Sequence, residues 1–110
     1  MPAEPTEPHV IAGPASGIAA ALAARGRGGP VLVIADDATI AACGPAWAGS
    51  FAAAGIVHRV VTHGVDVAAA AAGLDPRTVL GAGGAEALAV AAAVATTLGV
   101  PLVESPDATA

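Results

Sequence analysis

The chain has 110 residues, of which 55% are hydrophobic and only 12% are charged, so it is too apolar for a disordered protein and suits a single domain in length. The formal net charge is −5 and Lys and Arg together number four, which argues against a nucleic-acid partner because phosphate backbones are held by clustered cations. The longest apolar run, residues 87–95, is shorter than the roughly 18–20 residues of a membrane span, so no membrane association is expected.

Residues 1–8 are polar and rich in proline, where a signal peptide would need a basic start and an apolar centre. This segment is expected to be disordered, the ordered domain to cover residues 9–104, and residues 105–110 to form a flexible tail. The single Cys43 allows no internal disulfide. Both features favour a cytoplasmic protein.

The first half of the chain alternates short apolar runs with helical patterns. We predict a strand at residues 9–13, a helix at 16–25 and a strand at 31–35. A second helix is predicted at 39–54, ended by Gly55. Its larger side chains have the spacing of one buried face, and they are Ile40, Cys43, Trp47 and Phe51.

The second half repeats this alternation. The sequence predicts a strand at residues 56–62, a short helix at 66–72 capped by Asp66, and a strand at 77–81. A long helix follows at 85–98, and a last strand at 100–103. The stripe of the long helix expected to be buried consists of Leu88, Ala91, Val94, Ala95 and Leu98.

This βαβαβαβαβ order predicts an α/β fold, a single doubly wound (Rossmann-like) parallel sheet with helices on both faces. Ligands of such sheets bind at the carboxyl ends of the strands, near the switch point in strand order. The residues that follow strands, among them Gly13, Asp36, His63 and the turn at residues 81–84, are therefore the candidates for a site.

The turn at residues 81–84, "GAGG", stands between a predicted strand and a predicted helix. Gly81, Gly83 and Gly84 would expose backbone N–H groups at a helix N-terminus, where a phosphate can approach. Two interpretations remain open: a phosphate cradle, or a tight turn that lets the helix pack closely. No Lys, Arg or His lies between residues 78 and 106, and Glu86 is the charged residue nearest the turn.

The run from Val79 to Pro106, "VLGAGGAEALAVAAAVATTLGVPLVESP", resembles the nucleotide-binding segment of the glycerol dehydrogenase, iron-containing alcohol dehydrogenase and dehydroquinate synthase superfamily. Upstream, "GPASGIAAALAARGRGGPVLVIAD" is similar to the opening helix and second strand of that family. The resemblance covers residues 9–108 and implies a cofactor domain in which Asp36 contacts the adenosine ribose.

The departures from this family pattern remove its charges. The Gly-Gly-Gly-Lys motif begins with Gly83 and Gly84, but its lysine is replaced by Glu86, and Asp107 stands where the family has threonine. The chain also ends where the helical domain of the family, which carries the metal ligands, would begin. The resemblance therefore implies that no cofactor is required and that NAD(P) binds weakly.

The ionisable residues have ordinary explanations beside functional ones. Asp37 is expected to cap the second helix, while Asp36 either assists it or binds a ligand. His58 and Arg59 are expected to be solvated, and Cys43 and Trp47 to be core residues. If a site exists, His63 and Glu86 would be its acid–base residues, with Asp36 and Asp107 beside them. The His and Cys residues lack zinc-site spacing, so no metal is expected.

Three functions are compatible with this pattern. The first is a module or pseudoenzyme that binds a small molecule, with an anionic one among the candidates. The second is a small metal-independent isomerase, lyase or cyclase of a specialised biosynthetic pathway. The third is a non-catalytic subunit that docks on a separate helical, metal-binding partner. The apolar surface of so small a domain also predicts a homodimer, paired through the edge strand at residues 9–13.

Overall fold

One all-parallel sheet forms the centre of the computed structural model, which describes residues 9–11, 15–24, 26, 29–63, 66, 69 and 71–105. Its strand order is β1-β5-β4-β2-β3. The strands are β1 (His9–Val10), β2 (Val31–Ala35), β3 (His58–Thr62), β4 (Thr78–Ala82) and β5 (Leu102–Ser105). The predicted doubly wound α/β fold is confirmed.

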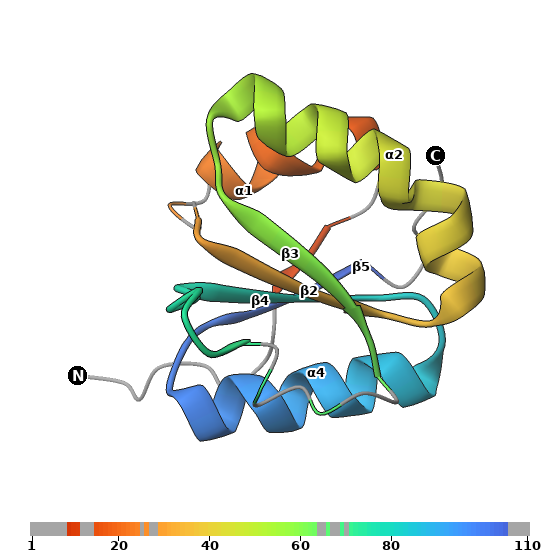
Figure 1. The fold of residues 1–110 in the computed structure, drawn as a ribbon, viewed down its shortest axis with the longest axis vertical. Helices are drawn as coiled ribbons and strands as arrows, with labels where there is room; N and C mark the ends of the chain where they lie inside the picture. The colour runs from red at the N-terminus through yellow and green to blue at the C-terminus, as the bar shows by residue number, and fades with distance from the viewer. Residues whose placement is uncertain are drawn as a thin grey trace.

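Helices cover both faces of the sheet (Figure 1). A 3₁₀ turn, η1 (Ala15–Gly17), leads into α1 (Ile18–Ala24), which packs with α2 (Asp37–Ala54) on one face, while α4 (Ala85–Leu98) covers the other. The helix predicted at residues 66–72 falls largely outside the described residues. Within it, Asp66 accepts a hydrogen bond of 3.1 Å from the Ala69 N–H, as predicted for a capping residue.

The central strand β2 shows why the chain builds three layers. All five of its residues are buried. Because successive side chains point to opposite faces, Val31, Val33 and Ala35 join the core under α1 and α2. Leu32 and Ile34 join the core over α4. A continuous apolar run without polar alternation is what a strand buried on both sides requires.

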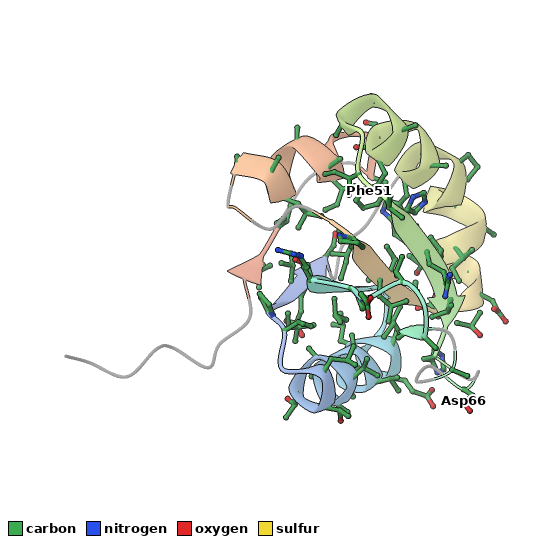
Figure 2. All side chains as sticks on the ribbon, turned by 60° about the vertical axis from the view of Figure 1, so that its left-hand side comes forward. Phe51 and Asp66 are labelled. Carbon is green, nitrogen blue, oxygen red and sulfur yellow. The ribbon has the colours of Figure 1, made fainter. Side chains whose placement is uncertain are left out.

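The core beneath α2 contains the two aromatic residues of the chain, Trp47 and Phe51, both fully buried together with Cys43. The predicted buried face of this helix is thus confirmed, although Ile40 is only partly buried. Phe51, which is labelled in Figure 2, comes from α2. It stacks on the imidazole of His58 in β3, with ring centroids 4.6 Å apart.

His58 is therefore only partly solvated, and not fully as the sequence predicted, because Phe51 covers one face of its ring. Arg59, its neighbour in β3, is exposed as predicted, and its guanidinium donates to the Ala72 carbonyl at 3.3 Å. Side chains of a strand alternate in direction, so only one residue of the pair can face the aromatic core.

Burial lowers the pKa of His58 from its ordinary value of 6.5. The imidazole of His58 therefore binds a proton more readily in the unfolded chain than in the folded one. Its contribution to the free energy of unfolding is complete above pH 6.5 and is lost as the pH falls toward the lowered pKa of the folded state. Denaturant titrations at several pH values should show this decline. The decline should be smaller in His58→Gln, and an identical pH profile in the variant would contradict the assignment.

The buried stripe of α4 agrees only in part with the predicted one. Ala91 and Ala95 are buried as predicted, Ala87 is buried in addition, and Leu98 is 39% exposed. The reason lies in β4, where a Cβ on Gly81 would stand 2.7 Å from the Ala91 Cβ. The helix approaches the strand so closely that only small residues fit between them, and the larger side chains are displaced to the flanks.

The ends of the sheet also differ in detail from the prediction. The last strand continues to Ser105, two residues beyond the predicted end at 103, and Asp107 lies outside the described residues. At one edge, β1 pairs in parallel with β5. The part of the predicted dimerisation segment that forms β1, His9–Val10, is thus an edge strand, and the homodimer itself remains a prediction.

Candidate functional site

Two neighbouring strands of the sheet lead into helices on opposite faces. From β2 the chain enters α2 and returns to the sheet as β3, and from β4 it enters α4 and returns as β5 on the other side. Right-handed crossovers in opposite directions must lie on opposite faces, so the turns after β2 and β4 diverge. This is the topological switch point, at which open α/β sheets bind ligands.

The register of the two strands brings their carboxyl ends together. Ala35, the last residue of β2, pairs with Ala82, the last residue of β4. Asp36 and Gly83 are the residues that follow. The two segments identified in the sequence, the acid after β2 and the glycine turn after β4, are therefore adjacent in space.

Asp36 joins the N-termini of α2 and α4. Its Oδ1 accepts a 2.8 Å hydrogen bond from the Thr39 N–H in the first turn of α2, and its Oδ2 accepts a 2.9 Å bond from the Gly84 N–H, at the cap of α4. The expectation that Asp37 caps α2 is wrong, because Asp37 is already helical and Asp36 has the extended backbone of the cap.

The three glycines of the turn have different surroundings. Gly81 lies inside β4 and provides the close packing of α4. Gly83 has φ +103°, and a Cβ there would overlap the Asp36 carboxylate and lie 2.6 Å from the Thr39 hydroxyl. Gly84 is exposed and begins α4 without a side-chain cap of its own. The tight-turn interpretation thus accounts for Gly81, while Gly83 and Gly84 contact the candidate site.

The hydrogen bonds hold Asp36 in its ionised form. The Thr39 side chain, followed by the backbone N–H groups of Gly84 and Thr39, lowers the pKa of Asp36 from 3.8 to about 2, and the charge of His63 adds to this effect. Near neutral pH this carboxyl group is ionised, so it can act as a negative charge or a hydrogen-bond acceptor but not as a proton donor.

The remaining predicted site residues are not assembled to the same degree. His63, just after β3, is partly buried, and its charge acts on Asp36. Glu86 is exposed in the first turn of α4. The structure therefore brings Asp36, Gly83 and Gly84 into contact and places His63 within electrostatic range, and it leaves Glu86 at the rim.

Sequence reasoning missed Thr39, which contributes both its N–H and its side chain to Asp36. A signal was available in the sequence, because Thr39 stands three residues after Asp36. A capping side chain commonly accepts a hydrogen bond from the N–H of the residue three positions later.

No alternative centre stands out in the described part of the chain. Two adjoining hollows, which share Ala71 and Leu98, lie at the opposite end of α4 from the switch point. Among the described residues, no group of three or more His, Cys, Asp or Glu side chains is placed to hold a metal ion. Within the same residues, no helix has the length and apolar character needed to cross a bilayer.

No protein-family model matches the chain, and the curated proteins contain no match to it. Membership of the dehydrogenase and dehydroquinate synthase superfamily therefore stays a prediction, made from the order of motifs in the sequence.

Proposed function

We propose that the chain is a small-ligand-binding module, a degenerate cofactor domain without dehydrogenase activity of its own. The observation that supports this proposal is the meeting of the β2 and β4 turns at the switch point, where the ionised carboxylate of Asp36 lies against the N-terminus of α4. The ligand would contact the carboxyl edge of these two strands beside His63.

Nicotinamide dinucleotides are poor ligands for such an edge. The carboxylate of Asp36 already accepts a hydrogen bond from the Gly84 N–H, and Glu86 adds a second negative charge in the first turn of α4. A pyrophosphate brought to the same turn would meet like charges, which weaken binding. The proposed binding therefore does not depend on a nicotinamide cofactor.

We expect the native chain to bind NAD(H) and NADP(H) with a Kd above about 0.1 mM. Glu86→Lys should tighten this binding by about tenfold, because it replaces a repelling charge at the helix N-terminus by an attracting one. Glu86→Gln, which only removes the charge, is the matched control and should lie between the two. Calorimetry is the measurement, and micromolar affinity of the native chain would restore a dehydrogenase-type function.

One observation favours a second candidate, a metal-independent enzyme that uses acid–base chemistry. His63 and Asp36 interact electrostatically at the carboxyl edge, and imidazole is the side chain that most often serves as a general acid or base. In this proposal His63 transfers the proton and Glu86 assists at the rim. Turnover that is lost in His63→Gln and in Glu86→Gln would support it over simple binding.

A further inference from the structure

The edge of the sheet at β3 presents a row of backbone groups that point away from the molecule. β3 is the last strand in the sheet order, and Figure 1 shows it in front of β2, between α2 and α4. The Val31 N–H in β2 donates to the Val57 carbonyl at 2.9 Å, so Val57 and every second residue after it direct their N–H and C=O groups to β2. The N–H and C=O groups of His58, Val60 and Thr62 therefore point outward.

The two edges of the sheet differ in their protection against another strand. β1, at the opposite edge, has only 2 residues, and in the sequence Pro8 precedes it and Pro14 follows closely. Short edge strands and prolines are common means of preventing edge-to-edge association. β3 has 5 residues, HRVVT, without Pro, Gly or Lys, and Val60 and Val61 in it are only partly buried. A strand added beside β3 would cover these valines, so this edge suits a partner better than β1 does.

The described charges are separated along the direction of the strands. Arg59 and Arg77 stand at the amino ends of β3 and β4. The acidic residues that follow β2, β3 and β4 at their carboxyl ends are Asp36, Asp37, Asp66 and Glu86, whereas Asp75, before β4, and Glu104, within β5, depart from this pattern. Each copy has a formal net charge of −5, so two copies repel each other unless the basic end of one meets the acidic end of the other. An antiparallel arrangement provides this complementarity.

We propose that β3 pairs with β3 of a second copy in the antiparallel orientation, about a two-fold axis at Val60, and so joins the two five-stranded sheets into one. In this register Val60 lies opposite Val60 of the second copy, and His58 lies opposite Thr62. The outward N–H and C=O groups of each copy then bond to those of the other. Arg59 lies toward the end of the neighbouring strand that leads to Asp66.

This interface keeps the homodimer expected from the sequence but moves it from β1 to β3. The inference does not rest on the proposed function, because the residues that point outward from β3 are not part of the candidate site.

The native chain provides the first test. Light scattering from about 10 µM to 1 mM should show a change from the monomer mass to twice that mass. Over the same range, the Val60 and Thr62 amides should exchange their hydrogen at least about tenfold more slowly at the high concentration, whereas the Val61 amide, which faces β2, should be protected at both. A chain that remains monomeric at about 1 mM, or a dimer whose Val60 amide exchanges as in the monomer, would overturn the proposal.

Two proline variants distinguish the edges. Val60→Pro removes an outward N–H from β3 and leaves the bonds to β2, which an edge strand tolerates. Val10→Pro is the matched control, because the Ile11 N–H donates to the Glu104 carbonyl and Val10 therefore points outward from β1. We expect the Kd of the dimer to rise at least about tenfold in Val60→Pro and less than about threefold in Val10→Pro. The reverse order would place the interface at β1.

Two charge-reversal variants give an independent result should Val60→Pro fail to fold by circular dichroism. Arg59→Glu places a negative charge beside the acidic end of the second copy, and Arg77→Glu makes the same change of charge two strands away from the interface. At low salt we expect Arg59→Glu to raise the Kd of the dimer at least about fivefold, and Arg77→Glu less than about twofold. Equal effects of the two variants would mean that net charge alone governs association, and would refute the antiparallel pairing.

Discussion

Replacing Phe51 by alanine is expected to lower the free energy of unfolding by about 3–5 kcal/mol, the usual cost of truncating a buried phenylalanine. The side chain is fully buried between α2 and β3 and stacks on His58. Since the free energy of unfolding of small domains is only about 5–15 kcal/mol, the variant should be at best marginally stable at room temperature.

Urea titration followed by circular dichroism measures this loss. Val57→Ala is the control, because Val57 is 62% exposed and its truncation should cost less than about 0.5 kcal/mol. A second readout is the pH dependence, since His58 loses its aromatic cover in Phe51→Ala and its pKa should return toward 6.5. A loss below about 1 kcal/mol would show that the core beneath α2 closes over the cavity.

Replacing Gly83 by alanine is expected to cost about 2–4 kcal/mol, from a strained backbone and from steric overlap together. With φ +103°, residue 83 has a conformation that residues with a Cβ rarely adopt, and the added methyl group would displace the Asp36 carboxylate and the Thr39 hydroxyl. Displacement of the Asp36 carboxylate should also break its hydrogen bond with the Thr39 N–H, which caps α2.

Gly84→Ala is the matched control for this prediction. Gly84 has φ −74°, and a Cβ there would meet only the Asp36 Oδ2, at an ordinary 3.6 Å, so the substitution should cost less than about 1 kcal/mol. The measurement is thermal unfolding of Gly83→Ala and Gly84→Ala in parallel, which compares the stability that each variant loses. Equal stability of Gly83→Ala and Gly84→Ala would refute the close fit between the turn and Asp36.

The elements predicted best from sequence are those with unambiguous ends. The bounds of β2 and α4 agree with the predicted ones, because charged residues or glycines stop these apolar runs on the carboxyl side. The buried face of α4 was predicted only in part, since Ala91 and Ala95 were expected there and Ala87 was not. Periodicity favours large residues at an interface, whereas the approach of the helix to Gly81 in β4 selects alanine, and that approach is a tertiary property.

The candidate site was predictable in its place but not in its contacts. Strand order and the rule for parallel sheets brought attention to Asp36 and the glycine turn. The bond between Asp36 and Gly84 depends on the register of β2 with β4, and no local pattern encodes a register between strands so far apart in sequence. The prediction named Asp37 as the cap of α2 where the structure has Asp36. Either of two adjacent aspartates can cap a helix, and only the backbone angles show which of them does so.

The pairing of β1 with β5 has a consequence for how the chain folds. During synthesis the residues of β1 emerge first, yet their neighbour in the sheet is the last strand, through the pairs His9 with Val103 and Val10 with Glu104. A contact across nearly the whole chain carries a large entropic cost of closure and forms late. The β2, β3 and β4 strands can assemble earlier, and β1 is held in place only after the final residues of the sheet have been made.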